Sequence, residues 1–156
     1  MSPPEFDSQG NLAVGVHPAP LKEVIARFGH GTSQRQLVTS RLIRVYELAN
    51  NTSKLERFII FGSYDTAKAD PNDVDIILIM HDDFTQQECA VEARPLFDHL
   101  RAQQEFGASV FAIRHRGFCP IFIRKWLFTT ICTAGQTRRT MVCRRCTMIF
   151  QITRFE

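Results

Sequence analysis

The amino-acid sequence predicts an α/β domain of the α+β type, in which a small mixed β-sheet carries helices packed mainly on one face. Two short apolar runs, at residues 58–61 and 76–80, are separated by a polar loop and indicate neighbouring strands. A long segment with apolar residues at helical spacing precedes the first run. A further helical segment and a third apolar run follow the second, so the predicted order is helix, strand, strand, helix, strand.

The N-terminal part supplies an extended leader and two helices. Four of the seven prolines lie in residues 1–20, which we expect to be extended. Residues 21–28 form a short helix candidate that stops near Gly29. A capping box at residues 33–36 opens a longer helix that continues to about residue 50. The apolar residues of this helix share one face at helical spacing: Val38, Leu42, Val45 and Tyr46.

The central part supplies three strands and one further helix. We expect strands at residues 57–61 and 73–80, with the polar loop between them. Thr85 opens a second capping box and starts a helix to about residue 104, which Pro95 should kink or split. The third strand is expected at residues 108–113, after a glycine that ends the helical segment.

Charge divides the chain into two parts. Residues 1–118 carry 12 Lys and Arg against 15 Asp and Glu, a net charge of −3, whereas residues 119–156 carry 7 against one acid, a net charge of +6. At 156 residues the chain has the size of one domain, which we place at residues 21–116, after the leader at 1–20. The Cys- and Thr-rich segment 117–156 is then an atypical basic tail, and we interpret it as a frameshifted or divergent end.

The composition excludes several classes of protein. No stretch reaches the roughly 18 apolar residues that a membrane span needs, and residues 1–20 lack the apolar run of a signal peptide. Both observations predict a cytoplasmic protein without a membrane partner. Five cysteines are an odd number, which does not favour a secreted disulfide framework. The Cys-x-x-Cys at residues 143–146 lacks the second pair of a zinc site.

The loop between the first two strands carries the residues that indicate a function. Gly62 and Ser63 end the first apolar run, and Asp73 and Asp75 begin the second. Carboxylates at positions i and i+2 of a strand face the same side, where they repel each other unless a cation lies between them. A hard cation such as Mg²⁺ or Mn²⁺ takes oxygen ligands and shares them with phosphate. The alternative is an ordinary turn at residues 62–65, followed by a loop of solvated acids.

This pattern resembles the signature of the polymerase-beta-like nucleotidyltransferase superfamily, in which a Gly-Ser turn after a strand is followed by Asp-x-Asp at the start of the next strand. The resemblance extends over about residues 7–116. This part of the chain is also similar to a group of small bacterial nucleotidyltransferase-like proteins. It implies a nucleotidyltransferase-like fold in which Gly62 and Ser63 hold a nucleoside triphosphate. It also implies that Asp73 and Asp75 are catalytic and bind two metal ions, Mg²⁺ or Mn²⁺.

Three further positions bear on the resemblance. Tyr64 could stack on a base and Lys68 could contact phosphates, and the alternatives are core packing for Tyr64 and a solvated surface position for Lys68. The superfamily has a third acid on a neighbouring strand, and this chain has Ser109 where that acid is expected. Glu105 precedes this strand and is not expected to reach the acid pair.

Two functions follow from the resemblance. The first is a metal-dependent nucleotidyltransferase that moves a nucleoside monophosphate from a nucleoside triphosphate to a hydroxyl of a small molecule, an RNA or a protein. The second is a degenerate, weakly active nucleotidyltransferase-fold protein that binds a nucleotide or a partner. Small members of the superfamily serve as antitoxins, so a helical, toxin-like protein is a possible partner for this second function. The missing third acid favours it.

Overall fold

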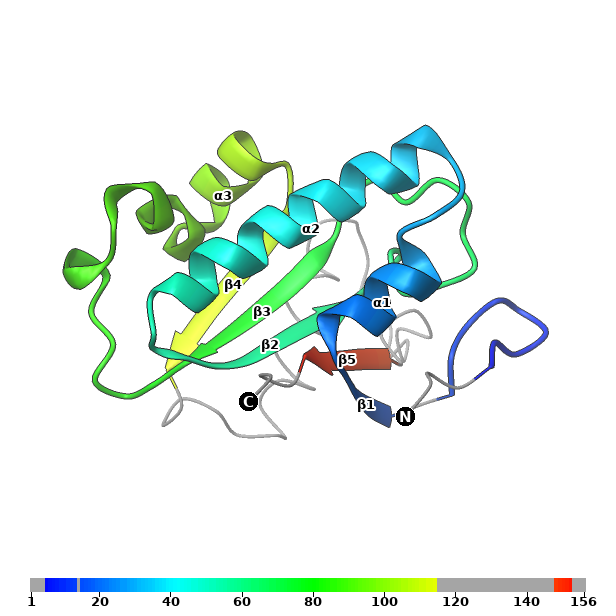
Figure 1. Cartoon of the computed structure of the whole chain (residues 1–156), viewed down its shortest axis with the longest axis horizontal. Helices are drawn as coiled ribbons and strands as arrows, with labels where there is room; N and C mark the ends of the chain where they lie inside the picture. Colours follow the sequence, from blue (N-terminus) through cyan, green and yellow to red (C-terminus); the bar gives the residue numbers. More distant parts are fainter. Residues whose placement is uncertain (1–4, 14, 115–147, 153–156) are drawn as a thin grey trace, which may run out of the picture.

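A five-stranded mixed β-sheet forms the centre of the molecule, and helices lie against it (Figure 1). The structure is a computed structural model that describes residues 5–13, 15–114 and 148–152. The order of the strands across the sheet is β1-β5-β2-β3-β4, so the predicted α+β class is confirmed. The strands are β1 (Gly15–Ala19), β2 (Leu55–Phe61), β3 (Asp75–Met80), β4 (Ser109–Arg114) and β5 (Met148–Ile152).

The strand pairings bring the polar loop between β2 and β3 to one edge of the sheet. β2 and β3 are antiparallel, with Phe61 opposite Asp75. β3 and β4 are parallel, with Asp75 opposite Ser109. The end of β2 therefore meets the start of both β3 and β4. The opposite end of the β2–β3 pair places Leu55 beside Met80.

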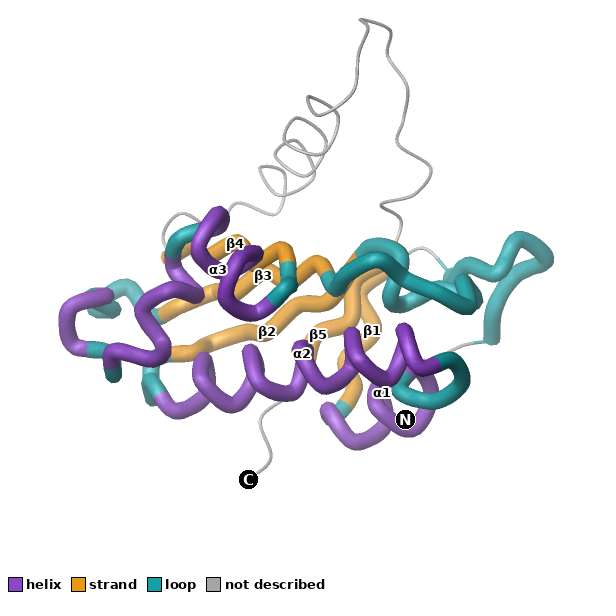
Figure 2. The backbone as a smooth tube through the Cα atoms, turned by 90° about the horizontal axis from the view of Figure 1, so that it is seen from above, coloured by secondary structure: helices purple, strands orange, loops and turns teal. Residues whose placement is uncertain are grey.

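Helices cover mainly one face of the sheet (Figures 1 and 2). They are α1 (Leu21–Phe28), α2 (Ser33–Asn51), α3 (His99–Phe106) and two 3-10 helices, η1 (Gln86–Glu88) and η2 (Val91–Phe97). Their apolar side chains pack against Phe58 and Ile60 of β2 and against alternate residues of β3. The intervening residues, such as Ile59 and Ile77, form a second buried cluster on the other face. Strands that are buried on both faces are continuously apolar, which explains the uninterrupted runs in the sequence.

The two N-terminal helices agree with the prediction except at one cap. α1 spans the predicted residues, and α2 extends to Asn51. The N-cap of α2 is Thr32, one residue before the predicted box, because the Thr32 hydroxyl accepts the N–H of Arg35 at 3.2 Å. The apolar face predicted for α2 is buried, with Val38, Leu42 and Val45 fully inside.

The helix predicted at residues 85–104 is divided, as Pro95 led us to expect, but it does not begin at Thr85. The chain forms η1, then η2 with Pro95 inside it, and only then α3. Thr85 makes no capping hydrogen bond. The cap of α3 is Asp98, whose carboxylate accepts the N–H of Arg101 at 3.1 Å. Pro95 lies inside η2, and the boundary between η2 and α3 is at Asp98, three residues after the proline.

Two strands of the sheet come from segments that the sequence analysis placed outside the domain at residues 21–116. β1 lies in the predicted leader, and β5 lies in the predicted tail, between β1 and β2 in the sheet. The other residues of the tail lie outside the described part of the chain, so its boundary at residue 116 and its divergent origin stay predictions. Within residues 5–13, 15–114 and 148–152, no helix is both long and apolar enough to cross a bilayer.

Candidate functional site

Asp73 and Asp75 converge on one hydroxyl at the edge of the sheet. The Oγ of Ser109 donates to Oδ2 of Asp73 at 2.8 Å, and the N–H of Ser109 donates to the carbonyl of Val74 at 3.0 Å. The same hydroxyl also lowers the pKa of Asp75. Because one hydroxyl proton serves one acceptor at a time, we assign the hydrogen bond to Asp73, where the geometry shows it. The i, i+2 spacing thus places both carboxylates beside Ser109.

Among the described residues, no basic side chain pairs with the two acids. Burial raises the pKa of Asp75 to about 7, and the neighbouring Asp73 raises it further against the lowering effect of Ser109. Two carboxylates that are held together without a cation form a site of strong negative potential. Such a site favours either a proton or a metal ion.

Gly62 brings the backbone into contact with this pair. Its φ of +94° lies in the left-handed region, which glycine adopts without steric cost. A Cβ at this position would overlap Oδ2 of Asp75 and lie 3.1 Å from its Cγ. Two independent features therefore favour glycine at position 62: its backbone conformation and the close approach of the Asp75 carboxylate. The predicted juxtaposition of the Gly-Ser corner and the acids is present in the structure.

A buried arginine holds the loop that follows Gly62. Arg35 of α2 donates to the carbonyls of Tyr64 at 2.9 Å and Thr66 at 3.0 Å, and also to that of Lys68. It donates as well to the carbonyl of Phe28 at 3.1 Å. A single guanidinium thus satisfies carbonyls that the loop leaves without partners in secondary structure. The sequence analysis missed this residue, although an arginine three residues before Val38, on the apolar face of α2, is a readable signal.

Asp65 is a second residue that the sequence analysis missed. Its side chain is 1% exposed, and its Oδ2 has no hydrogen-bond partner. Burial raises the pKa of Asp65 to about 8, and the charge of Asp75 raises it further, whereas Arg35 lowers it. Asp65 therefore lies within electrostatic reach of the acid pair and carries a proton at neutral pH. Nothing in the sequence distinguishes it from a solvated turn residue.

Tyr64 and Lys68 do not join the site as predicted. The ring of Tyr64 is fully buried, and its hydroxyl lies 2.9 Å from Oγ1 of Thr39. The prediction that Tyr64 stacks on a base is therefore wrong for this conformation, and the alternative of core packing is what the structure shows. Lys68 is exposed and lines a different hollow, together with Thr32 and Phe28 rather than with the acid pair. Ser63 remains at the corner, partly exposed, and its carbonyl accepts from Oγ1 of Thr66 at 2.8 Å.

The donor set suits a cation that brings further ligands of its own. Ser109 occupies the position opposite Asp75, and Glu105 instead pairs with Arg101 at 3.1 Å. Across the described residues, no group of three or more His, Cys, Asp or Glu side chains is placed to hold a metal ion. Two carboxylates and a hydroxyl are hard oxygen donors, and Mg²⁺ is often bound by one or two carboxylates together with substrate phosphates. Asp73 and Asp75 therefore fit a magnesium ion that arrives with a nucleotide.

The chain belongs to a family of unknown function, DUF6932, which it matches over residues 4–149. This match includes β1 to β4 and much of the segment predicted as a tail. No curated protein and no solved structure matches the chain. The family membership carries no activity with it, so the site itself has to suggest the function.

Proposed function

We propose that this protein is a metal-dependent nucleotidyltransferase that transfers a nucleoside monophosphate from a nucleoside triphosphate to a hydroxyl acceptor. One observation carries the proposal: Asp73 and Asp75 lie together beside the backbone of Gly62, and no basic side chain in the described part of the chain pairs with them. The mixed sheet that presents the acids at the start of β3 and the resemblance of the motif to the superfamily support it.

Each residue of the corner has a role in the proposed reaction. Asp73 and Asp75 would hold Mg²⁺ or Mn²⁺, which when bound neutralises charge on the phosphates of the nucleotide. The corner at Gly62 and Ser63 would lie against the triphosphate, where a backbone without a side chain allows a close approach. The acceptor oxygen forms a bond to the α-phosphorus, the bond to pyrophosphate breaks, and the hydroxyl proton passes to solvent.

The ionisation of Asp75 is a condition for metal binding. Because its pKa is raised to about 7 in the metal-free protein, a proton competes with the cation in acidic solution. We therefore expect the affinity for Mg²⁺ and Mn²⁺ to fall as the pH is lowered below neutrality. Ser109 would still orient Asp73, which is the carboxylate that remains ionised.

The direct test is Mg²⁺-dependent transfer from each of the four labelled nucleoside triphosphates to a panel of small molecules, RNA and protein. Asp73→Asn and Asp75→Asn keep the shape of the side chains and remove their charges, so each should abolish transfer. Asp83→Asn is the matched control, because Asp83 is exposed and pairs with Lys54 at the other end of the β2–β3 pair. Transfer that survives both Asp73→Asn and Asp75→Asn would exclude the mechanism.

A specific observation favours a second function, a nucleotide- or partner-binding module without turnover. Ser109 stands in the place of the third acid and donates to Asp73, so no third carboxylate is available there to accept the proton of the acceptor. In this case the protein would bind a magnesium–nucleotide complex or a helical, toxin-like protein. Calorimetry that finds nucleotide binding without transfer to any acceptor would support this alternative. Ser109→Asp would then be expected to introduce activity, and Ser109→Ala would serve as its control.

A further inference from the structure

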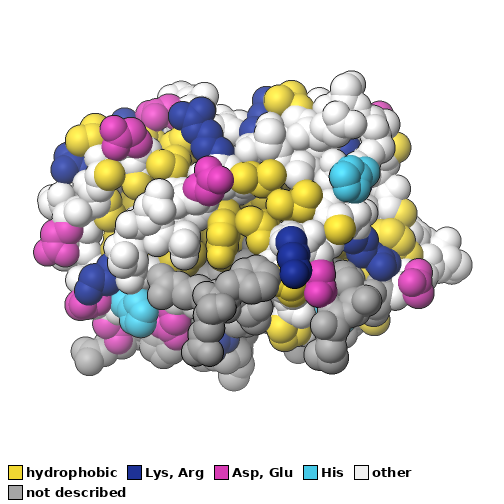
Figure 3. Space-filling view, viewed as in Figure 1, with side chains coloured by type: hydrophobic (Ala, Val, Ile, Leu, Met, Phe, Trp, Pro, Cys, Tyr) yellow, Lys and Arg dark blue, Asp and Glu magenta, His cyan; other side chains and the backbone are white. Residues whose placement is uncertain are grey.

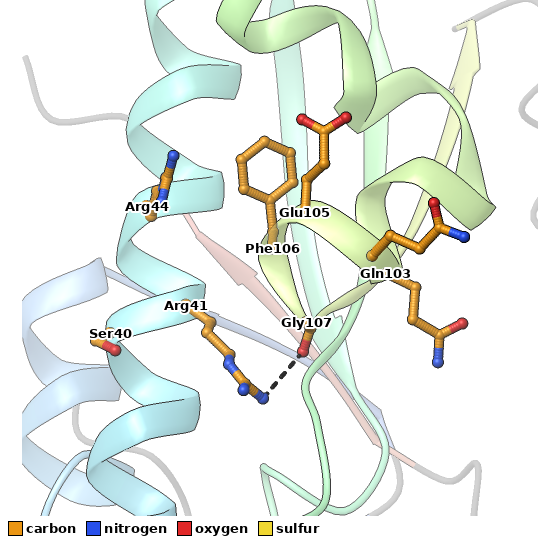
Figure 4. A pocket seen from close by; sticks show the side chains of 8 residues that line it. Ser40, Arg41, Arg44, Gln103, Glu105, Phe106 and Gly107 are labelled. Atoms are coloured by element: carbon orange, nitrogen blue, oxygen red, sulfur yellow. Dashed lines mark hydrogen bonds between the residues drawn. The ribbon is translucent and has the colours of Figure 1, made fainter.

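A polar hollow of about 420 Å³ lies between α2 and the last turn of α3 (Figure 4). We call it the α2–α3 hollow. Two arginines of α2, Arg41 and Arg44, line one side, and the opposite side comes from α3 and its C-terminal glycine. On the side from α3, the lining residues include Gln103, Glu105, Phe106 and Gly107.

Arg41 is positioned by the glycine that ends α3. Its Nη1 donates to the carbonyl of Gly107 at 3.4 Å, a long hydrogen bond that is drawn in Figure 4. A Cβ on Gly107 would lie only 2.7 Å from Cζ of Arg41, and the φ of Gly107 is +62°. The guanidinium thus packs flat on a position that only glycine leaves open. An arginine has five N–H donors, so most of those of Arg41 remain for a ligand.

Arg44 adds a second cation to the same hollow. Its guanidinium lies over the ring of Phe106, 5.3 Å from the centroid, and the side chain is exposed. Within the described part of the chain, no carboxylate pairs with Arg41 or Arg44. The acid on the lining, Glu105, is engaged with Arg101 at 3.1 Å. The two arginines extend toward different parts of the hollow, Arg41 to Gly107 and Arg44 to Phe106 (Figure 4), and a guanidinium without an acidic partner favours an anion.

The hollow adjoins the acid pair. Gly107 precedes Ser109 by two residues, and Ser109 donates to Asp73. On the other side, Gln34 of α2 donates to the carbonyl of Pro71 at 3.0 Å, in the loop that leads to Asp73. α2 therefore contacts the approach to the acids near its start and carries the arginines two turns later. The lining residue Gly107 is thus two positions along the chain from the residue whose hydroxyl contacts Asp73.

The positive charge is local rather than spread over this side of the molecule. In the space-filling view of the helical face, Lys and Arg side chains alternate with Asp and Glu, and apolar atoms show between them (Figure 3). Such a surface does not resemble the broad basic stripe that tracks a nucleic-acid backbone. A paired-arginine hollow of this size suits one phosphate group, which guanidinium recognises through paired N–H donors.

We propose that the α2–α3 hollow binds a phosphate group of the acceptor, so that the acceptor is a nucleotide or an RNA end rather than an uncharged small molecule. This inference rests on the proposed function for the word acceptor, but phosphate binding by the hollow does not depend on transfer. Arg41 and Arg44 hold the phosphate, and the side chain of Gln103 can donate a further hydrogen bond. The acceptor hydroxyl then lies toward Asp73 and Asp75.

The test measures binding by the full chain without metal ion or nucleoside triphosphate. The probes are inorganic phosphate, adenosine 5′-monophosphate, and a short oligoribonucleotide with and without a 5′-phosphate. Arg41→Gln and Arg44→Gln should each weaken phosphate binding by roughly tenfold, the effect of losing one charge-assisted hydrogen bond. Glu105→Gln should strengthen binding because it removes the acid from the lining. Lys54→Gln removes one positive charge at the opposite end of β2 and should leave binding unchanged.

The outcomes separate the two proposals. Preference for the 5′-phosphorylated oligoribonucleotide over the unphosphorylated one identifies a terminal phosphate, and equal binding of both identifies the phosphodiester, each with loss in the arginine variants. Asp73→Asn should abolish transfer without changing phosphate binding, so a failed transferase assay leaves this result intact. The proposal is overturned if wild-type protein binds none of the probes, or if Arg44→Gln, an exposed change that leaves the fold undisturbed, binds as the wild type does.

Discussion

The aspartates at the two ends of the β2–β3 pair have opposite electrostatic environments. At one end, Asp83 is exposed and pairs with Lys54, and hydrogen bonding to Lys54 is the first reason that the pKa of Asp83 is lowered. At the other end, Asp73 and Asp75 both lie beside Ser109, and burial raises the pKa of Asp75 to about 7. The same strands thus carry a neutralised acid at one end and an unneutralised pair at the other.

This difference separates an ordinary surface interaction from a candidate site. An exposed ion pair contributes little to stability, because water screens it. A partly buried pair of like charges opposes folding, and its presence points to a ligand that neutralises it. The acid end also has a loop that is fixed by Arg35 and a glycine whose position leaves no room for a Cβ beside Asp75. Four changes test whether the two ends differ in the way that the structure indicates.

The largest expected effect is that of Arg35→Met on the loop at the acid end. The substitution keeps much of the side-chain volume and leaves the carbonyls of Tyr64 and Thr66 among those without a donor. Because buried unsatisfied groups cost about 1–3 kcal/mol each, we expect a loss of roughly 3 kcal/mol or more in the free energy of unfolding. Urea denaturation measures it. Arg44→Met, at an exposed arginine of the same helix, should stay within about 0.5 kcal/mol of wild type, and equal losses would refute the role of Arg35.

The next effect concerns Gly62→Ala, with Gly31→Ala as the matched control. Both glycines have a positive φ, +94° and +116°, so each substitution carries a backbone cost of about 1 kcal/mol. Only at Gly62 does the new Cβ meet a carboxylate, since the nearest atom at Gly31 is Cδ of Arg35 at 4.0 Å. We therefore expect Gly62→Ala to be the more destabilising by about 1–3 kcal/mol. Thermal or urea unfolding of both variants, side by side, gives the difference, and similar losses would contradict the close approach.

A smaller effect is the pH dependence that Asp65 imposes on stability. Burial raises its pKa to about 8 in the folded protein, from an ordinary value of 3.8 for an aspartate, so the folded state binds the extra proton between these values. Stability therefore falls as the pH rises through this window, with a slope of up to about 1.4 kcal/mol per pH unit. Asp65→Asn mimics the protonated acid and should flatten the fall. Chemical denaturation at a series of pH values tests it, and identical slopes for the two proteins would show that Asp65 is ionised in the fold.

The smallest effect should come from the end with the ion pair. Asp83→Asn removes a charge that water already screens, so we expect no measurable change in stability. It should also leave the rise in melting temperature on adding Mn²⁺ unchanged, whereas Asp75→Asn should remove that rise. Differential scanning fluorimetry with and without Mn²⁺ compares the two variants. If Asp83→Asn and Asp75→Asn reduce the rise in melting temperature equally, Mn²⁺ does not bind specifically at Asp73 and Asp75.

The sequence by itself determined the features that depend on residues close together in the chain. The apolar face of α2, the short α1 and the strand runs around the polar loop were all predictable, because their periods are local. The spacing of Asp73 and Asp75 and the small corner at Gly62 placed the candidate site for the same reason. The helix that was predicted to begin at Thr85 was wrong at its start, because residues 86–88 and 91–97 form η1 and η2 and the α-helix begins only at His99, after the cap at Asp98.

Only the tertiary structure decided which side chains meet. Arg35 reaches a loop about 30 residues away, and the hydroxyl of Ser109 reaches an acid 36 positions earlier in the chain. The burial of Tyr64 and Asp65 and the place of β5 in the sheet follow from the same long-range packing. Charge compensation and desolvation depend on these distant neighbours, whereas a sequence pattern records near ones. For that reason the sequence indicated the two acids, and only the fold showed that no basic side chain among the described residues pairs with them.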